Sequence, residues 1–151
     1  QYLICCAGEY LEGTILDSKS GAIQRIIDSN LTATIKLIRK IYSYFVAMRS
    51  GTIIHINSVA GKSIAVNEPV YSATKHGMAA FLRALRLDAR QYNVRVMDVF
   101  LGATQTSMTE GRDNYSKLID VKEAAGLIYA AAKMTQLTAQ IEEFHISRFT
   151  G

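Results

Sequence analysis

The sequence predicts an α/β fold in which a parallel sheet carries helices on both faces. Short apolar runs, each typical of a buried strand, alternate along the 151 residues with longer patterns that repeat at helical spacing. Turn-forming residues such as glycine, serine and asparagine stand at several of the boundaries. The resulting order is β-α-β-α-β-α-β, and this alternation favours a parallel sheet because a helical crossover joins each strand to the next.

The first half of the chain contains two predicted strands and one long helix. Residues 2–6 are continuously apolar, which is the pattern of a strand buried on both faces. A helical pattern covers residues 20–48, and residues 50 and 51, serine and glycine, end it. An apolar strand over residues 52–57 then leads to Ser58. The main apolar stripe of the long helix comprises Ile23, Ile27, Leu31, Ile35, Ile38, Tyr42 and Phe45.

The second half supplies the remaining helices and strands. A loop over residues 61–68 precedes Pro69, whose fixed φ suits the first turn of a helix. Residues 103–116 form a polar stretch with room for a short helix. The regular elements are predicted as a helix over 69–91, a strand over 94–100, a helix over 121–134 and a strand over 142–146.

Composition and charge limit the class of protein. Hydrophobic residues make up 49% of the chain and charged residues 20%, which is ordinary for a globular protein, so we expect residues 1–151 to form one domain. The formal net charge of +4 is mild and the basic residues are scattered, which argues against nucleic-acid binding. No apolar run approaches the roughly 20 residues that span a bilayer, so we expect no membrane segment and a cytoplasmic location.

The cysteine and histidine residues give no sign of a metal site. Cys5 and Cys6 are adjacent, which suits neither ordinary disulfide geometry nor zinc binding, so we expect buried free thiols. His55, His76 and His145 are separated in the sequence and lie in no cluster of cysteine or acidic residues. A serine hydrolase is disfavoured as well, because the sequence has no Gly-x-Ser-x-Gly motif.

The most informative pattern for function is the pair Tyr71 and Lys75. At positions i and i+4 of a helix they share one face, where the lysine ammonium would favour the ionised form of the phenol. A phenol with an unperturbed pKa of about 10 would then exchange protons closer to neutral pH. Ser58 ends a strand at the sheet edge where ligands bind in parallel α/β folds. The spacing also occurs on helices without function, but together these residues indicate proton transfer to or from an oxygen.

With these residues in place, the chain resembles the short-chain dehydrogenase/reductase family. Asn30 stands where that family has a catalytic helix asparagine, and residues 5–8, Cys-Cys-Ala-Gly, stand where it has Asn-Asn-Ala-Gly. Residues 101–106, Leu-Gly-Ala-Thr-Gln-Thr, are similar to its Pro-Gly-x-x-x-Thr. The resemblance runs from the family's fourth strand to its seventh. It implies a Rossmann-like, doubly wound parallel sheet whose N-terminal half, with the glycine-rich phosphate loop, is missing from this chain.

The resemblance also implies an activity and a set of site residues. The protein would be an NAD(P)-dependent oxidoreductase that interconverts a secondary alcohol and a ketone. Tyr71 would be the general acid or base, and Lys75 would lower its pKa and bind the nicotinamide ribose. Ser58 would hold the substrate oxygen, while Asn30 would kink its helix and anchor a water molecule. Besides Tyr71 and Lys75, the residues implied in cofactor binding are Ala7, Gly8, Gly102 and Thr106.

Three further expectations follow from the resemblance. Because the phosphate loop is missing, we expect the sequence to be part of a longer protein and the isolated chain to be inactive. The long helices over 20–48 and 69–91 resemble those through which the family forms homodimers or homotetramers. The residue that selects NAD or NADP would precede Gln1.

A protein of this fold that binds a nucleotide or a partner without turnover is the alternative to an enzyme. It is favoured by the missing phosphate loop, by Cys5 and Cys6 in place of two asparagines, and by Leu101 in place of proline. The presence of all four catalytic residues favours the enzyme, because a protein that only binds has no chemical need for them together.

Overall fold

The computed structural model describes residues 1–64, 66–135 and 138–149. Within these residues, the centre of the fold is a four-stranded parallel sheet in the order β1-β2-β3-β4. The strands are β1 (Tyr2–Cys5), β2 (Gly51–Ser58), β3 (Val94–Leu101) and β4 (Glu143–Ile146). The predicted parallel α/β sheet is confirmed, and each strand boundary lies within one residue of its prediction.

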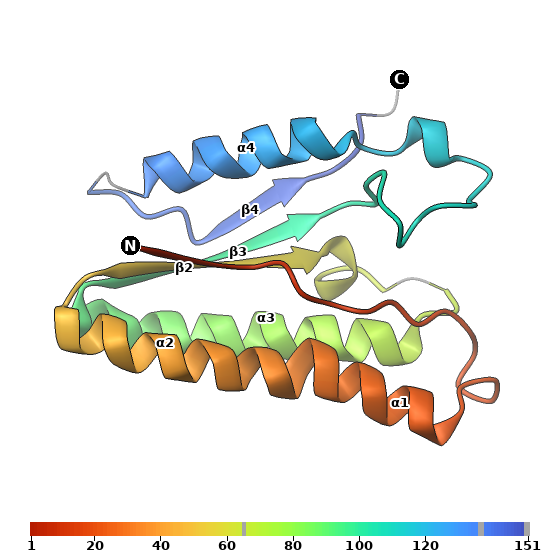
Figure 1. Cartoon of the computed structure of the whole chain (residues 1–151), viewed down its shortest axis with the longest axis horizontal. Coiled ribbons are helices and arrows are strands. Elements are labelled where there is room, and N and C mark those ends of the chain that lie inside the picture. The colour runs from red at the N-terminus through yellow and green to blue at the C-terminus, as the bar shows by residue number, and fades with distance from the viewer. Residues whose placement is uncertain (65, 136–137, 150–151) are drawn as a thin grey trace.

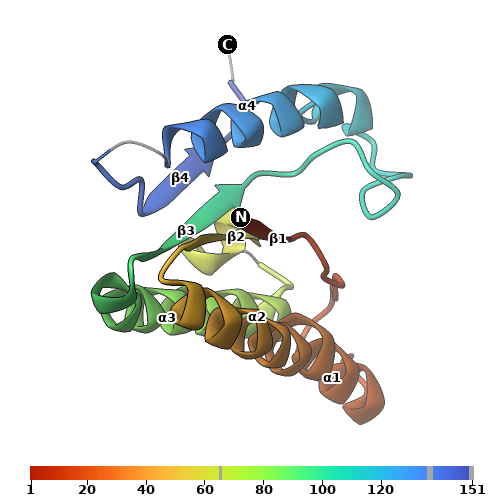
Figure 2. The same ribbon diagram turned by 60° about the vertical axis from the view of Figure 1, so that its left-hand side comes forward.

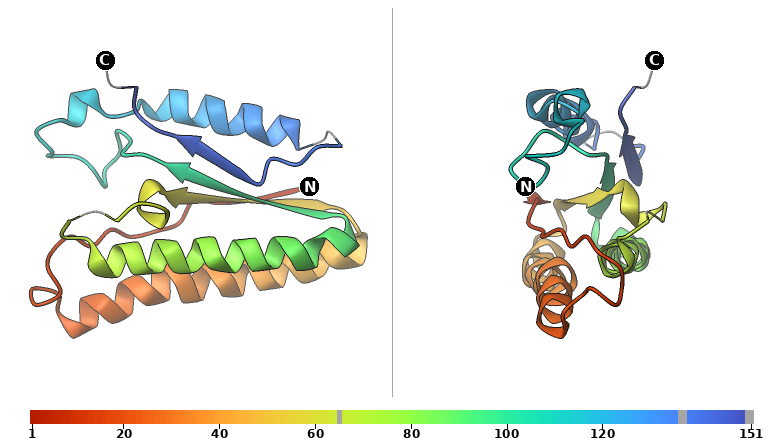
Figure 3. Two further views of the ribbon diagram at one scale, coloured as in Figure 1. Left: turned by 180° about the vertical axis from the view of Figure 1, so that it is seen from behind. Right: turned by 90° about the vertical axis from the view of Figure 1, so that its right-hand side faces the viewer.

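Helices cover both faces of this sheet, as predicted. On one face lie α1 (Ser20–Ile27), α2 (Thr34–Met48) and α3 (Pro69–Ala89), whereas α4 (Val121–Met134) lies on the other (Figures 1 and 2). The view from behind shows the same two layers (Figure 3). Because the strands are parallel and follow one another across the sheet, the crossover through α4 has the opposite hand to the two crossovers before it.

Each face of the sheet has its own apolar core. Successive residues of β2 and β3 point to opposite faces, so both strands are apolar along most of their length. The core beneath α2 and α3 includes Ile38, Phe45, Ile53, Met78, Leu82, Val94 and Val96. The core beneath α4 includes Ile54, Met97, Val99, Ile119, Ala124, Ala131 and Ile146.

The long helix predicted over residues 20–48 is divided by a π-helical turn at Asp28–Ala33. A π turn is wider than an α-helical turn and shifts the register of the residues on either side. Most of the predicted apolar stripe is partly buried on both sides of the turn: Ile23 packs against one core cluster, and Leu31, Ile35 and Tyr42 pack against another. Fully buried positions recur every four residues across the turn, at Ile26, Asn30, Thr34 and Ile38. The π turn contains Asn30, the residue at which the resemblance implies a kink.

β1 differs from its prediction. It pairs only with β2 among the described residues, and Tyr2 and Ile4 are 44% and 49% exposed, so the strand is not buried on both faces. Both cysteines are free thiols, as expected, but Cys5 is buried whereas Cys6 is exposed. A continuous apolar run predicts a strand with both faces buried. In this structure β1 lies at the edge of the sheet, and the face that carries Tyr2 and Ile4 is exposed.

The other helical elements follow the sequence closely. Pro69 occupies the first turn of α3, and the carboxylate of Asp120 caps α4 by accepting hydrogen bonds from two backbone N–H groups. Short 3₁₀ turns follow β2, α3 and the loop after β3, at Val59–Gly61, Arg90–Tyr92 and Tyr115–Lys117. No helix in the described part of the chain combines the length and apolar character that crossing a bilayer requires.

An ion-pair cluster joins α3 and the turn after β2 to β4. Glu143 accepts a hydrogen bond from Arg83 Nε at 2.8 Å and pairs with the Lys62 amine through its other oxygen. Burial alone would raise the pKa of Glu143, but the bonds from Arg83 and Lys62 outweigh it and lower that pKa from 4.5 to about 2. The carboxylate is therefore held in its charged form by the fold.

We expect this cluster to make stability depend on pH in the acid range. The folded-state pKa of Glu143 lies below its unfolded value, so its contribution is complete above about pH 4.5 and is lost as the pH falls towards 2. Glu143→Gln should lower the free energy of unfolding by about 1–2 kcal/mol at neutral pH and by much less near pH 2.5. Urea titrations at the two pH values measure the difference, and equal losses at both would contradict this assignment.

Candidate active site

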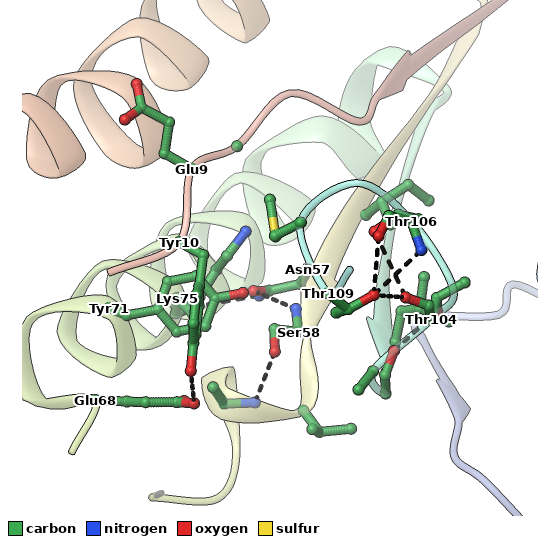
Figure 4. A pocket seen from close by; sticks show the side chains of 18 of the residues that line it. Glu9, Tyr10, Asn57, Ser58, Glu68, Tyr71, Lys75, Thr104, Thr106 and Thr109 are labelled. Carbon is green, nitrogen blue, oxygen red and sulfur yellow. Dashed lines mark hydrogen bonds between the residues drawn. The ribbon is translucent and has the colours of Figure 1, made fainter. Parts of the chain in front are cut away.

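A cleft at the carboxyl ends of the strands brings most of the predicted site residues together. It has a volume of about 370 Å³ and lies between the segments that follow β1, β2 and β3 and the first turns of α3. Ser58 ends β2, and Tyr71 and Lys75 extend from α3 to line the same cleft (Figure 4). The predicted residues that line the cleft are Gly8, Ser58, Tyr71, Lys75, Gly102 and Thr106.

Tyr71 and Lys75 share one face of α3, as their spacing predicts. Both side chains are buried, with 8% and 6% of the residue surface exposed. Lys75 Nζ lies over the phenol ring, 5.5 Å from its centroid, in a cation–π arrangement. The amine therefore lines the same cleft as the phenol, and it faces the ring of Tyr71.

The electrostatics of Tyr71 differ from the sequence prediction. Burial raises the pKa of Tyr71, a hydrogen bond with Ser58 lowers it, and the charge of Glu68 raises it again. The positive charge of Arg112 lowers it, but the net direction is upward. The net direction is therefore opposite to the predicted lowering of this pKa. Desolvation of the phenol outweighs the lowering by Ser58 and Arg112 and keeps the phenol protonated at neutral pH.

Lys75 is perturbed by the same burial. Desolvation lowers the pKa of its amine to about 8, against the opposing effect of the negative charge on Asp98. Near neutral pH the amine is still mainly an ammonium, but a modest rise in pH removes its proton. A lysine of this kind is sensitive to small changes in the charges around it.

Asn30 lies behind the cleft rather than in its wall. Its side chain is buried, accepts a hydrogen bond from Glu9 N–H at 2.7 Å and donates one to the Glu9 carbonyl at 2.8 Å. It also donates to Thr74 Oγ1 at 3.3 Å. These bonds tie the segment after β1 to α3 and hold Gly8 against Lys75, where a Cβ on the glycine would stand 3.4 Å from Lys75 Nζ.

Gly102 begins the wall that follows β3. Its N–H donates to the Ile146 carbonyl at 2.8 Å, and a Cβ at this position would stand 3.3 Å from Ile119 Cδ1 and from the same carbonyl. Glycine here permits close packing on the end of β4. This is a different reason from the close approach to a cofactor that the resemblance implies.

Thr106 lies further along the same wall. Its hydroxyl is 3.5 Å from the Thr104 carbonyl, at the limit of a hydrogen bond. Its backbone N–H donates to Thr109 Oγ1 at 3.1 Å, which fixes the turn. The turn is therefore ordered by its backbone, while the Thr106 hydroxyl retains capacity to bind a ligand.

Sequence reasoning missed the residues that close the outer part of the cleft. Tyr10 packs edge-on against Tyr71 with ring centroids 5.1 Å apart, and its hydroxyl donates to Glu68 Oε1 at 2.6 Å (Figure 4). The Arg112 guanidinium lies 5.1 Å from the Tyr10 ring centroid. Tyr10 and Arg112 belong to irregular segments and Glu68 precedes α3, so no periodic pattern marks the three residues.

The cysteine segment contributes one wall residue. Cys6 lines the cleft, and although the residue as a whole is exposed, partial burial of its thiol raises the pKa, so the thiol is protonated at neutral pH. Ala7, which the resemblance implies in cofactor binding, is exposed and is not among the residues that line the cleft. Across residues 1–64, 66–135 and 138–149, no group of three or more histidine, cysteine or acidic side chains is placed to hold a metal ion.

Comparison with known families decides the class of this protein. The model of the short chain dehydrogenase family matches residues 1–117, which include every segment around the cleft. The chain belongs to the short-chain dehydrogenase/reductase family. The resemblance inferred from Asn30, Ser58, Tyr71 and Lys75 is thereby confirmed at the level of the family.

Curated relatives of this short-chain dehydrogenase are longer proteins. Over 120 residues the chain is 28% identical to carbonyl reductase family member 4 of Xenopus tropicalis, covering 78% of this chain and 51% of that protein. Over 105 residues it is 31% identical to short-chain dehydrogenase ptmH of Penicillium ochrochloron, covering 70% and 38%. The chain thus spans about half the length, or less, of these relatives.

Solved structures share the fold. ElxO with NADP bound has a TM-score of 0.86 at 19% identity, covering 97% of this chain and 65% of that one. The short-chain dehydrogenase from Sphingobium yanoikuyae in complex with NADPH has a TM-score of 0.85 at 24% identity, covering 95% and 56%. These likenesses confirm the Rossmann-like fold for the part of the sheet that this short-chain dehydrogenase chain contains.

Proposed function

We propose that this chain carries the proton-transfer centre of an NAD(P)-dependent oxidoreductase that interconverts a secondary alcohol and a ketone. The observation that carries the proposal is the presence of Ser58, Tyr71 and Lys75 in one cleft, with Asn30 buried behind it. A phenol, a hydroxyl and a cation thus line a single cleft at the ligand-binding edge of a parallel sheet.

Tyr71 is the proposed proton donor when a carbonyl is reduced. Its raised pKa keeps the phenol protonated at neutral pH, which suits donation to the oxygen of a developing alkoxide. The Ser58 hydroxyl lines the same cleft as the Tyr71 phenol, so both can contact one substrate oxygen, which is a positioning effect. In the reverse direction Tyr71 accepts the alcohol proton, and this direction is favoured by higher pH.

The residues proposed to hold the cofactor are those of the predicted set that line the cleft, namely Gly8, Tyr71, Lys75, Gly102 and Thr106. The described site fits the nicotinamide end of the cofactor. Gly8 leaves space for the ribose beside the Lys75 amine, and the Thr106 hydroxyl can bond the carboxamide. When bound, NAD(P)H supplies the hydride that reduces the carbonyl carbon. The NADP and NADPH bound in the two related structures support this class of cofactor.

Assembly through the helices over 20–48 and 69–91 is part of the proposal. Several large apolar side chains on these helices are exposed, namely Leu37, Tyr44, Met48 and Leu87. A second copy of the chain that covers them, as a homodimer or homotetramer, would remove apolar surface from water.

Binding and turnover together separate this proposal from a nucleotide-binding protein without activity. The experiment uses the protein with any flanking sequence that its gene encodes, and follows the fluorescence of NADH and NADPH as protein is added. We expect at least one of the two to bind and to be oxidised with some member of a panel of ketones. Tight binding with no oxidation across the panel would favour the alternative, and an absence of binding to either cofactor would contradict both.

A further inference from the structure

One asparagine beneath the cleft binds the backbone of two proposed site residues. Asn57 Nδ2 donates to the Lys75 carbonyl at 3.3 Å, and Asn57 Oδ1 accepts a hydrogen bond from Ser58 N–H at 2.9 Å. Asn57 Nδ2 also donates to Asp98 Oδ2 at 2.9 Å. A single side chain therefore links the end of β2 to α3 at the points where Ser58 and Lys75 enter the cleft.

The carboxylate that holds this asparagine is itself buried. Asp98 lies on β3 opposite His55 on β2, and both residues are 1% exposed. Asp98 Oδ1 lies 3.0 Å from His55 Nδ1, while Oδ2 accepts from Asn57, so both oxygens have partners. Burying a carboxylate costs several kcal/mol and is tolerated only when such partners are present. Two apolar residues in place of Asp98 and His55 would fill the same space at lower cost.

The space around Asn57 allows it little movement. The residue is 4% exposed. A Cβ on Gly61 would stand 3.0 Å from Asn57 Nδ2 and 3.0 Å from the Lys75 carbonyl oxygen. The turn after β2 therefore packs directly against Asn57 and the backbone of α3, and a change of the Asn57 rotamer would displace one of them.

We propose that Asn57 and Asp98 are positioning residues. Asn57 fixes the position of Ser58 relative to Lys75. Asp98 orients Asn57 and places a negative charge near the Lys75 amine. The proposal rests on the proposed function, since it assigns a role toward two residues of that centre. The charge on Asp98 opposes the fall in the pKa of Lys75 that burial causes. Without that charge, Lys75 would lose its proton at lower pH.

Several elements contribute groups to the surroundings of Lys75. The titratable and charged side chains that line the same cleft or adjoin Asp98 are Cys6, Glu9, Tyr10, His55, Glu68, Tyr71, Arg83 and Arg112. Glu9 is paired with Arg25, and Glu68 accepts the hydroxyl of Tyr10. Asp98 supplies the negative charge that acts on the pKa of Lys75.

Asp98→Asn tests the electrostatic part with little change of shape. The pKa of Lys75 can be followed by the carbon-13 chemical shift of its Cε, assigned with a Lys75→Arg variant. We expect this pKa to fall by about half to one unit. Glu143→Gln is the matched control, because it removes a carboxylate from the neighbouring strand that binds other partners. An unchanged pKa in Asp98→Asn, or an equal fall in the control, would overturn the electrostatic role.

Asn57→Ala tests the positioning part. We expect kcat for carbonyl reduction to fall about 10–100-fold with KM changed less than about threefold, because the backbones at Ser58 and Lys75 lose their common anchor. Thermal melting checks that the variant folds. Asn57→Ser is the second variant if it does not, since a serine keeps a polar group but is too short to bind both backbones. Wild-type kcat in either folded variant would overturn the positioning role.

The two measurements also separate this proposal from the proposed function. The titration of Lys75 requires no substrate and no turnover. A shifted pKa in Asp98→Asn, in a protein that reduces no carbonyl, would contradict the oxidoreductase and support the electrostatic link. Normal turnover with an unshifted pKa would overturn the role of Asp98 and leave the oxidoreductase intact.

Discussion

Replacing Tyr71 by phenylalanine is expected to reduce carbonyl reduction by a factor of about 10²–10⁴, the usual contribution of a positioned general acid. The variant keeps the ring that packs edge-on against Tyr10 and lies under the Lys75 amine, and it loses only the hydroxyl. The dissociation constant of the reduced cofactor should rise much less than turnover falls, because the ring and the other residues proposed to hold the cofactor remain. Steady-state kinetics and cofactor fluorescence measure the two quantities on the same preparation.

Tyr10→Phe is the matched control for this prediction. It makes the same chemical change on the neighbouring ring and removes a hydroxyl that is already bound to Glu68. We expect less than about a tenfold loss of turnover, because the Tyr10 hydroxyl has no proposed role in proton transfer. Unchanged turnover in Tyr71→Phe, or equal losses in both variants, would show that Tyr71 is not the proton donor.

Gly51→Ala is expected to cause the largest loss of stability, about 1–3 kcal/mol. Gly51 begins β2 and is buried beneath α2, where a Cβ would stand 2.2 Å from Phe45 Cγ. Phe45 is itself buried, and the atom in conflict lies at the base of its ring, so rotation of the ring cannot relieve the overlap. Either α2 or the start of β2 must move, and denaturant titration of the free energy of unfolding measures the cost.

Gly126→Ala provides a comparison within the same chain. Gly126 is an exposed residue inside α4, and a Cβ there would meet nothing within 4 Å. Alanine has the higher helix propensity, so this variant should gain about 0.5–1 kcal/mol. The two glycine-to-alanine changes should thus have opposite signs, and a stable Gly51→Ala variant would show that the contact with Phe45 is looser than described.

Much of the fold could be predicted because local patterns agree with the tertiary structure. α4 has the bounds predicted for it, since its alanine-rich face and its Asp120 cap are local features. The π turn could not be predicted in the same way. Its buried face includes Asn30 and Thr34, and polar residues on a buried face are invisible to a pattern of hydrophobicity.

The positions of the site residues could be predicted from the sequence, but their electrostatics and their buried partners could not. Ser58, Tyr71 and Lys75 share a short stretch of sequence whose spacing encodes their geometry. The direction of the pKa of Tyr71 depends on burial by segments from elsewhere in the chain, which no spacing encodes. Asn57 and Asp98 were missed because polar residues within largely apolar strands carry no signal of their partners, and their contact exists only once β2 and β3 are in register.

The π turn also makes the site depend on the number of residues in a helix, and not only on their identity. Successive residues of an α-helix are separated by about 100° of rotation, so one residue more or fewer turns every earlier side chain to another direction. The wider turn at Asp28–Ala33 absorbs this rotation and directs the Asn30 amide at the Glu9 backbone. Because Asn30 binds the Glu9 backbone, the number of residues in this helix also determines where the neighbouring Gly8 packs against Lys75.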